Sequence, residues 1–281
     1  MFTFLGRFPE VTYNGYNVNN ILVKIAINDL TKKYTTVFYP YVIKEGERPD
    51  IIAADYYGDA RYDWLVYLCN NITDPYYQWP LNTNEFNRFI NKKYGSFENA
   101  NRQIAFWRNN WYKDDSIVTS SYYDALPAYA KKYWAPSDSG STTAPTYVRK
   151  NVDFSLETNK IISLAVSNNA PIAAGENIYQ YSAGTLSGSG RVMDSSNNTL
   201  TVKDVIGTFI ANTVYTFSNT ANTTATSSNT LYTSIDSNEA VYWEYVTSYE
   251  YEEELNESRK HILILDKAFL GVIESQLDQL L

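Results

Sequence analysis

The sequence has few of the residues on which catalytic and metal sites depend. Its 281 residues include one cysteine, Cys69, and one histidine, His261. A single cysteine excludes a disulfide within the chain and suits a reducing compartment. A single histidine excludes metal clusters built on several imidazoles and disfavours a Ser-His-Asp triad. Cys69 lies in the apolar run WLVYLCNN, so we expect a small buried hydrophobic side chain there and not a nucleophile.

Charge and long apolar runs are also scarce. Charged residues make up 19% of the chain, the formal net charge is −8, and the basic residues are dispersed. A nucleic-acid partner would need a basic footprint, which this distribution does not supply. No apolar stretch approaches the roughly 18 residues that span a bilayer, and the start MFTFLGRFPE lacks the pattern of a signal peptide. The sequence therefore predicts no nucleic-acid partner and no membrane segment.

No motif assembles a catalytic or cofactor site. The glycines of GTLSGSG, residues 184–190, do not match a dinucleotide or P-loop spacing and precede a strand-like segment, so we expect a turn. The carboxylates between Glu250 and Glu257 lie on a hydrophilic run, which is typical of a solvated face. Because no nucleophile, base and oxyanion donors come together, the sequence predicts a protein that is not an enzyme and has no cofactor and no metal.

Aromatic residues are abundant instead. They reach 16% of the chain, with 26 tyrosines, while 44% of all residues are hydrophobic, so the chain folds. Tyr and Trp combine a large apolar area with a polar tip and are enriched where proteins meet. A tyrosine-rich core is the alternative explanation. We favour the interface, because so many rings would overfill a core of this size.

The patterns along the chain predict an α+β architecture with an inserted all-β barrel or sandwich. Residues 161–235 hold five charged residues and no Trp, and short β-prone runs alternate there with turn residues. SNTANTTATSSNT, residues 218–230, is expected to be a polar loop or hairpin tip. The predicted domains are an N-terminal arm with strands (1–36), a core (37–85), a helical region with a linker at 135–146 (86–150), the β insertion (155–236), and a C-terminal strand and amphipathic helix (237–281).

Individual elements follow from periodicity and capping. ILVKIAIN, residues 21–28, alternates as a half-buried strand does. Thr83 precedes a helix with Phe86, Phe89 and Ile90 on one face, and Gly95 can end it. Ser96 is expected to open a second helix, on which three apolar residues follow helical spacing: Ala100, Ile104 and Trp107. Strands are expected at HILIL and along the alternation Val241, Trp243, Tyr245.

The segment from Tyr39 to Leu81 predicts the order strand, helix, helix, strand. Pro49 suits the first turn of a helix that buries Ile51, Ile52 and Tyr56 and ends at Gly58. A second helix follows in DARYDWLVYLCN, and Asp74-Pro75 turns the chain toward a final extended piece. The predicted core residues of this segment are Ile52, Tyr57, Gly58, Trp64, Leu65 and Leu68.

The order of these elements and the residues within them resemble a LysM module. The matching residues are Tyr41, Lys44, Gly46, Glu47, Ile52, Ala53, Tyr57, Gly58, Leu65, Leu68, Asn70, Asn71, Asp74 and Pro75, while QWPLN replaces the closing strand of such modules. LysM modules bind N-acetylglucosamine polymers, so the resemblance implies that glycan binding is one alternative function. A cell-wall hydrolase targeted by this segment is a third, which the missing catalytic constellation disfavours.

A narrower resemblance covers more of the chain. FYPYVIKEGERPDIIAADYYGDARYDWLVYLCNNITDPYYQWPL and YWEYVTSYEYEEELNESRKHILIL are similar to the small baseplate wedge subunit of contractile-tailed phages, the gene-product-fifty-three type. The resemblance spans roughly residues 1–115 and 240–275. It implies a structural subunit that clamps neighbouring wedge subunits. The implied partners are larger wedge subunits, the sheath-like wedge protein and neighbouring wedge copies, in the virion tail baseplate after assembly in the host cytoplasm.

Two aromatic or apolar groups are the predicted contact residues. The first group follows the second helix of the core: Tyr76, Tyr77 and Trp79. The second lies on the C-terminal helix DKAFLGVIESQLDQLL, whose N-cap is expected at Asp266 and whose apolar face includes Phe269, Val272 and Leu277. Such a helix either docks on its own domain or packs against another chain.

Overall fold

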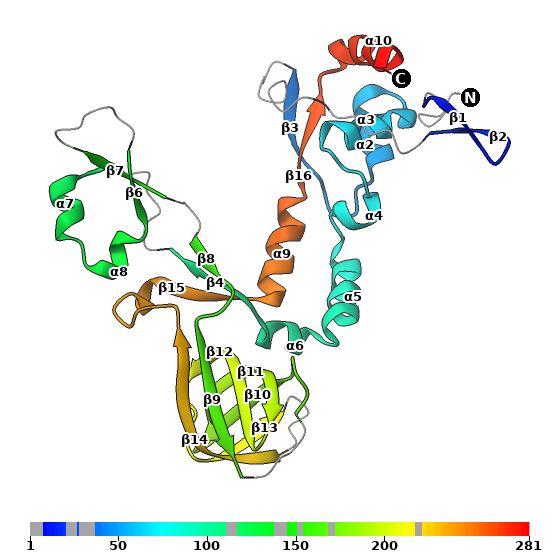
Figure 1. Ribbon diagram of the computed structural model, residues 1–281. Coiled ribbons are helices and arrows are strands. Elements are labelled where there is room, and N and C mark those ends of the chain that lie inside the picture. Colours follow the sequence, from blue (N-terminus) through cyan, green and yellow to red (C-terminus); the bar gives the residue numbers. More distant parts are fainter. Residues whose placement is uncertain are drawn as a thin grey trace. The chain divides into compact units, whose positions relative to one another are not determined.

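The fold is described from a computed structural model and comprises two compact units. The structure describes residues 8–20, 27, 37–110, 117–137, 145–150, 154–167, 172–216 and 221–280. The first unit contains residues 1–89 and 252–281, and the second contains residues 90–251. Helices and strands are mixed, and one all-β part is a closed barrel, which agrees with the predicted α+β class and with the predicted all-β part (Figure 1). The strand predicted at 21–28 lies outside the described residues except for Ile27.

The first unit is built from short elements at both ends of the chain. Those from the N-terminal part are β1 (Glu10–Tyr13), β2 (Tyr16–Asn19), β3 (Phe38–Val42), α2 (Pro49–Tyr57), η2 (Ala60–Tyr62), α3 (Asp63–Cys69), α4 (Pro75–Gln78) and α5 (Thr83–Tyr94). Those from the C-terminal part are α9 (Ser248–Ser258), β16 (His261–Leu265), η4 (Lys267–Phe269) and α10 (Leu270–Leu280). The boundaries between the units fall within α5 and α9.

Local sequence signals account for α2. Pro49 occupies its first turn, where the missing N–H costs nothing, and Gly58 ends it in the left-handed region at φ +85°. Ile52 and Ala53 are buried as the core of the helix, but Ile51 is 45% exposed, so the prediction that Ile51 is buried was wrong. Ile52 packs against Val66 of α3 and against Ile262 and Ile264 of β16, whereas Ile51 lies outside this contact.

The closing strand of the predicted core does not follow the helices. The segment after Asp74 forms α4, because the Asp74 side chain accepts from the Tyr76 N–H and Pro75 occupies the first turn. The strand that pairs with β3 is instead β16, antiparallel, with Phe38 opposite Leu265 and Val42 opposite His261 (Figure 1). A strand about 220 residues away in sequence therefore completes this sheet, which corrects the expected local strand–helix–helix–strand order.

After the exposed His261, the remaining residues of β16 are apolar because both faces of the strand are covered. Leu265 lies in the Trp64 cluster, which consists of the buried residues Phe38, Trp64, Leu65, Cys69 and Leu265. Ile262 and Ile264 lie in the Ile52 cluster, which consists of Ile43, Ile52, Val66, Ile262 and Ile264. The predicted strand HILIL and the predicted burial of Cys69, whose thiol is free, are thus confirmed. Tyr57 and Leu68 are only partly buried and pack against the Trp64 cluster.

The second unit contains two small sheets and the barrel. Its elements outside the barrel are α6 (Phe97–Arg102), β4 (Ile104–Asn109), β5 (Ile117–Thr119), α7 (Ser120–Ala125), α8 (Ala128–Lys131), β6 (Trp134–Pro136), β7 (Thr146–Arg149), β8 (Phe154–Leu156), η3 (Ala240–Tyr242) and β15 (Trp243–Thr247). The sheets have the orders β15-β4-β8 and β5-β7-β6. β6 and β7 occupy the ends of the predicted linker 135–146.

Two expectations for this region were wrong. Ser96 does cap a helix through the Asn99 N–H, but α6 ends at Arg102, and Ile104 and Trp107 lie on the strand β4. Pairing on both edges, with β15 and β8, outweighs the helical spacing of those residues and buries them in the Trp243 cluster, which consists of Ile104, Trp107, Tyr133, Trp134, Ile235 and Trp243. Val241 lies before β15 on η3 and is 81% exposed, so the predicted alternation from Val241 does not hold.

The barrel consists of six antiparallel strands. They are β9 (Lys160–Val166), β10 (Asn177–Ser182), β11 (Thr185–Ser196), β12 (Thr199–Gly207), β13 (Thr213–Thr216) and β14 (Ala221–Thr233), in the closed order β10-β11-β12-β9-β14-β13 (Figure 1). Its interior is a single cluster of Ile162, Leu164, Val166, Ile172, Ile178, Val192, Leu200, Val202, Val205, Phe209, Val214 and Ala225. The first and last strands pair with Lys160 opposite Thr233, so the ends of the barrel segment lie side by side.

Two polar segments became strands of this barrel. Residues 221–233 form β14 and pair with both β9 and β13, although their Thr, Ser and Asn content suggested a loop. Gly188 and Gly190 lie within β11 and not in a turn. A Cβ at Gly190 would lie 2.5 Å from Val202 Cγ1, so the glycine permits close packing of β11 on β12. Both segments are strands because they pair with neighbouring strands in the closed barrel, and no local sequence pattern encodes that closure.

Candidate partner-binding surfaces

The β1–β2 hairpin presents one apolar face. Asn14 and Gly15 form its turn at φ +50° and +80°, the conformations of the two-residue turn that matches strand twist. Tyr13 pairs with Tyr16 and Val11 with Val18, so these four side chains share one face. The other face carries Glu10, Thr12, Asn17 and Asn19.

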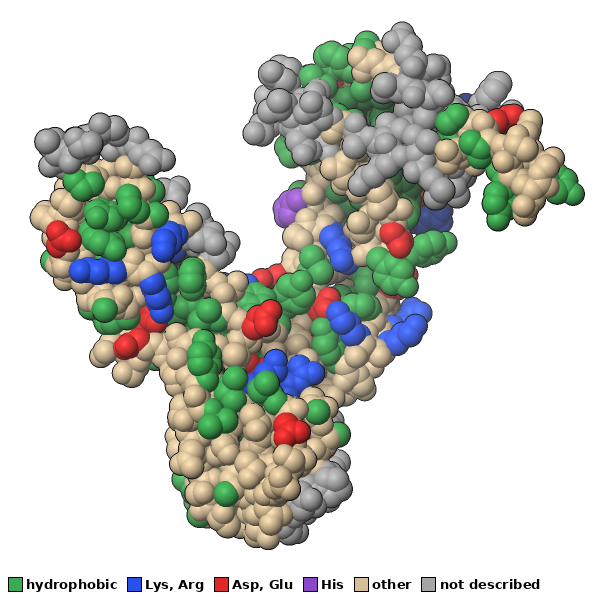
Figure 2. All heavy atoms as spheres, viewed as in Figure 1, with side chains coloured by type: hydrophobic (Ala, Val, Ile, Leu, Met, Phe, Trp, Pro, Cys, Tyr) green, Lys and Arg blue, Asp and Glu red, His purple; other side chains and the backbone are tan. Residues whose placement is uncertain are grey.

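This face is open to solvent. The exposed fractions are 68% for Tyr13, 74% for Tyr16, 40% for Val11 and 41% for Val18. Figure 2 shows hydrophobic side chains on the surface of this hairpin. A two-stranded hairpin is only marginally stable in water without further packing. An apolar face on such a hairpin is therefore typical of a surface that another protein covers.

The predicted anchors Tyr76 and Tyr77 are also exposed. They lie on the one-turn helix α4 with exposed fractions of 88% and 73%. The Gln78 side chain holds this turn in place, since its Oε1 accepts from the N–H groups of Thr73 and Asp74 at 2.7 and 3.0 Å. Both phenol rings are thus presented by a fixed backbone, which lowers the entropic cost of burying them in a partner.

Trp79, the third predicted anchor of this group, makes contacts within its own unit. Its Nε1 donates to the Glu47 carbonyl at 3.0 Å, and its ring meets the Tyr67 ring edge-on at 6.2 Å between centroids. The ring also packs against the Ile52 cluster. Trp79 therefore supports the fold of its own unit, and its role as a contact residue stays a prediction.

The C-terminal helix docks on its own unit through a face offset from the predicted one. Leu270 and Ile273 pack against the Trp64 cluster. Phe269 and Val272 remain 37% and 52% exposed, and the side chain of Leu277 lies outside the described residues. Asp266 caps this segment as predicted, because its carboxylate accepts from the Ala268 N–H at 2.8 Å. Phe269 and Val272 stay available for a contact.

Polar residues of the LysM-like segment hold β16 in place. Asn70 Nδ2 donates to the carbonyls of Val66 and Leu263, and its Oδ1 accepts from the Leu263 N–H at 2.8 Å. Tyr57 Oη donates to the Leu265 carbonyl at 2.9 Å. Burial raises the pKa of the Tyr57 phenol, so it stays protonated and able to donate. These side chains connect α2 and α3 to a distant strand, a role that sequence analysis did not assign to them.

The turn after β3 is fixed in the same way. Tyr41 Oη donates to Glu47 Oε1 at 2.8 Å, and the Lys44 N–H donates to Glu47 Oε2 at 2.9 Å. Burial, followed by the hydrogen bond to Glu47, raises the pKa of Tyr41 to about 12. Motif residues thus rigidify the loops of the unit, and we see no arrangement in them that would activate a nucleophile.

Side chains that could bind a metal ion or react are few among the described residues. No group of three or more His, Cys, Asp or Glu residues among them could hold a metal ion. His261 is exposed at the start of β16. Within the part of the chain that the structure describes, no helix is long and apolar enough to cross a membrane.

Strands were predicted in the N-terminal arm, but the β1–β2 hairpin and its apolar face were not. The signal was present, since YNGY places Asn-Gly between two short alternating runs, and Asn-Gly is the strongest short-range indicator of a hairpin. The predicted N-terminal arm is therefore a hairpin over residues 10–19.

Comparison with known proteins supports the resemblance seen in the sequence. A family model described as Base plate wedge protein 53 matches residues 3–134. The chain is 31% identical over 88 residues to the Baseplate wedge protein gp53 of Enterobacteria phage T4, an alignment that covers 28% of this chain and 43% of that relative. The chain thus spans less than half the length of this relative, and no solved structure matches. The matched residues 3–134 carry the hairpin, the β3–α2–α3 segment and α4, so this part of the chain is similar to base plate wedge protein 53.

Proposed function

We propose that this protein is a structural subunit of a phage tail baseplate wedge that clamps neighbouring wedge subunits together. The observation that carries the proposal is the open apolar face of the β1–β2 hairpin, which lies within the family-matched residues 3–134. An exposed face of this kind serves a subunit that completes its fold on a partner. We assign no catalytic role to the chain.

The proposed contacts are three. The hairpin face supplies Val11, Tyr13, Tyr16 and Val18, and α4 supplies Tyr76 and Tyr77. Phe269 and Val272 form a smaller third contact. By family resemblance the partners are larger wedge subunits, the sheath-like wedge protein and neighbouring wedge copies. The site of action is the virion tail baseplate, with assembly in the host cytoplasm.

The test is co-purification with the wedge subunits of the same phage after co-expression. Replacing Tyr13 and Tyr16 together by Ser should weaken the association by about 2–4 kcal/mol, because buried tyrosines dominate such interfaces. Replacing Tyr76 and Tyr77 by Ala should act in the same direction. Tyr122, which is 52% exposed on α7, provides the matched control Tyr122→Ser. Association that is equally strong in the wild type and both double variants would contradict the proposal.

Glycan binding by the LysM-like segment is the alternative. It predicts that chitin or peptidoglycan oligomers bind near α4 with micromolar affinity, measurable by calorimetry. We expect no binding, since α4 stands in place of the closing strand and Trp79 is engaged with Glu47. Binding that the Trp79→Ala variant abolishes would favour this alternative over the wedge subunit.

We also propose that residues 155–236 are an insertion that the host domain can lose. The support is the antiparallel pairing of Lys160 with Thr233, which brings the ends of the barrel segment together. A variant in which a short Gly/Ser loop replaces residues 160–233 should remain soluble and still co-purify with the wedge subunits. Insolubility of this variant would mean that the barrel completes the host core, for example through Ile206, which packs on the Trp243 cluster.

A further inference from the structure

The outer edge of β1 is open among the residues that the structure describes. β1 pairs with β2 and with no other described strand, so the hairpin is a two-stranded sheet with two edges (Figure 1). All four residues of β1 are exposed. The apolar side chains of the hairpin form one contact surface, whereas its edge offers backbone groups, which bind a partner in a different way.

The hydrogen-bond register decides which backbone groups of the hairpin point outward. The Asn20 N–H donates to the Pro9 carbonyl at 2.8 Å, so these two residues form a hydrogen-bonded pair. Bonded and non-bonded pairs alternate along an antiparallel ladder. The two pairs with polar side chains are therefore the non-bonded ones: Glu10 with Asn19, and Thr12 with Asn17. The N–H and C=O groups of Glu10 and Thr12 thus point away from β2.

β1, which is described in full, has no proline, lysine or bulge that would keep another strand away. The Thr12 hydroxyl donates to Asn17 Oδ1 at 3.2 Å, a bond between side chains that leaves the main chain of Thr12 unused. No hydrogen bond to a described residue engages the outward main-chain groups of Glu10 or Thr12. These groups are exposed donors and acceptors in the spacing that a further strand requires.

The β3–β16 sheet of the same unit is closed to a further strand. The Ile43 N–H donates to the Lys260 carbonyl at 2.9 Å. Alternation from this pair turns the main chain of Pro40 on β3 and of Leu263 on β16 outward. Pro40 has no N–H to offer, and the Asn70 side chain bonds both the N–H and the carbonyl of Leu263, as a neighbouring strand would. Of the two sheets described in the first unit, the hairpin is the one with an edge ready for another strand.

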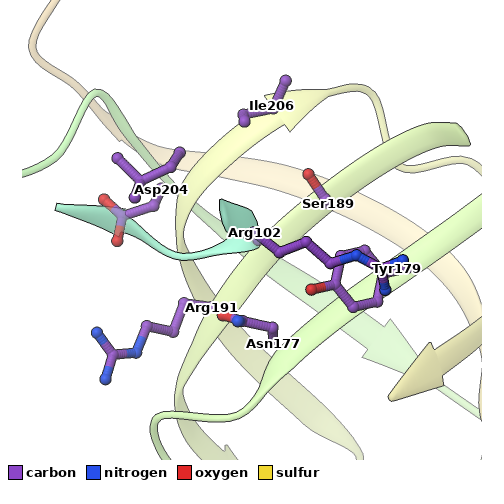
Figure 3. Close-up of a pocket in the computed structure, with 9 residues that line it drawn as sticks. Arg102, Asn177, Tyr179, Ser189, Arg191, Asp204 and Ile206 are labelled. Atoms are coloured by element: carbon purple, nitrogen blue, oxygen red, sulfur yellow. The ribbon is translucent and has the colours of Figure 1, made fainter. Parts of the chain in front are cut away.

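The cleft beside Tyr179 in the second unit offers no comparable open group. It has a volume of about 190 Å³ and is lined by residues of α6, β4, β15 and three strands of the barrel. Arg102 is the charged residue among those that line it, and its guanidinium carbon lies 5.1 Å from the centre of the Tyr179 ring (Figure 3). Because this charge is already engaged inside the second unit, the outward groups of β1 are the stronger candidates for binding.

We propose that another wedge subunit adds an extended segment along the outer edge of β1 and so forms a third strand of the hairpin sheet. The outward N–H and C=O groups of Glu10 and Thr12 bond to the main chain of that segment, as in strand addition. A two-stranded hairpin is marginally stable, and a third strand with an apolar face stabilises it, so the partner also completes this part of the fold. This binding mode rests on the proposed wedge function, whose partner it describes more closely.

Side-chain alternation and charge define the added segment. Val11 and Tyr13 share the apolar face and Glu10 and Thr12 the polar face, so the segment must alternate apolar and polar residues to continue both faces. A basic residue on its polar side would lie beside Glu10, and cross-strand pairs of opposite charge are favourable. The net charge of −8 disfavours a second copy of this chain as the occupant. The occupant is therefore an alternating segment of a different wedge subunit, with Lys or Arg on its polar side.

The test is a binding titration of the purified full chain against the wedge subunits of the same phage, with two proline variants. Thr12→Pro removes the outward N–H on β1, and Asn17→Pro removes the outward N–H at the paired position on β2. Both variants lose the side-chain bond between these residues and keep the bonds inside the hairpin, so they differ in the edge that they block. Thr12→Pro should weaken the association at least about tenfold and Asn17→Pro less than about threefold. Cross-strand nuclear Overhauser effects confirm the hairpin in each variant.

The outcomes separate this binding mode from the wedge function. If replacing Tyr13 and Tyr16 by Ser weakens the association but Thr12→Pro does not, the partner covers the apolar face without adding a strand. That result overturns the binding mode and leaves the wedge function standing. A larger loss for Asn17→Pro, or equal losses for both prolines, would overturn the choice of β1. If the wild type binds no wedge subunit, the binding mode and the wedge function fail together.

Two further measurements test the identity of the occupant. Glu10→Lys should weaken the association severalfold, with Glu98→Lys on the exposed side of α6 as the matched control. Stronger binding by Glu10→Lys would overturn the basic character of the segment. Sedimentation velocity of the chain alone should show a monomer. A dimer that Thr12→Pro abolishes would place a second copy on the edge and overturn the choice of partner.

Discussion

The barrel and the first unit use β-structure in opposite ways. In the barrel all six strands have neighbours on both sides, and twelve buried residues form one continuous core. Among its described residues the first unit has two two-stranded sheets, β1–β2 and β3–β16, and its two buried clusters hold five residues each. The barrel has no open edge and is complete in itself. The first unit leaves strand edges and an apolar hairpin face exposed, which is where a partner can add to the fold.

The largest effect should come from the core of the first unit. Trp64→Ala removes the largest side chain of the Trp64 cluster and should reduce the free energy of unfolding of that unit by about 3–5 kcal/mol. Hydrogen exchange should show faster opening of residues 37–85 and 261–265, with the barrel unchanged. The matched control Tyr76→Ala alters a side chain that is 88% exposed and should have no such effect. An unchanged melting temperature for Trp64→Ala would refute the core assignment.

The barrel should respond most to crowding of its backbone. Gly207 has φ +73°, and a Cβ there would lie 2.4 Å from the Ser187 carbonyl oxygen. Gly207→Ala should destabilise the barrel by about 2–4 kcal/mol, from the left-handed conformation and the clash together. Gly184→Ala is the control, since Gly184 has φ +81° with no atom within 4 Å of the added Cβ. If urea melts show equal losses for both variants, the close approach of β12 and β11 contributes nothing.

A smaller effect should follow loss of the bond between α3 and β16. Asn70→Ala removes the hydrogen bonds to the N–H and carbonyl of Leu263 and should cost about 1–3 kcal/mol. Residues 261–265 should exchange their amide hydrogens faster as a result. Asn84→Ala on the exposed side of α5 is the matched control. Unchanged exchange in Asn70→Ala would mean that the apolar faces of β16 alone hold it in place.

The smallest effect is the pH dependence of the cap at Asp266. Hydrogen bonds from the Ala268 N–H and from Tyr39 Oη lower the pKa of Asp266, and the Asp266 carboxylate raises the pKa of Tyr39. The Asp266 contribution to stability is therefore present above its unfolded pKa, about 3.9, and is lost as the pH falls through the folded value. Melting temperatures between pH 7 and 3 should fall less for Asp266→Asn than for the wild type. Parallel curves would contradict this assignment.

Sequence patterns predicted elements whose causes are local. Pro49 and Gly58 bound α2 as expected, and the β-prone runs of residues 161–235 form a barrel. The patterns failed where distant strands decide. Ile104 and Trp107 fit a helix by spacing but are recruited into β4 by pairing with β15 and β8, and the partner of β3 is a strand about 220 residues away.

The candidate surface was likewise predictable only where its cause is local in sequence. Exposure of Tyr76 and Tyr77 follows from the short turn after Asp74-Pro75, which is a local signal. Trp79, three residues further than Tyr76, bonds to Glu47 on the turn after β3, and only the assembled unit shows that contact. The cleft beside Tyr179 joins α6, β4 and β15 to the barrel, so no single segment of sequence could indicate it.

The pairing of β3 with β16 sets an order of events during translation. The barrel can close once Thr233 has left the ribosome, whereas β3 has no partner until Leu265 has followed it. At roughly 5–20 residues per second these 32 residues (265 − 233) take about 2–6 s. We therefore expect nascent chains stalled with Thr233 exposed to contain a protease-resistant barrel and a protease-sensitive segment 37–85. A resistant 37–85 segment in such chains would contradict this order. Prematurely terminated products would then carry a finished barrel and a first unit whose strand β3 lacks its partner β16.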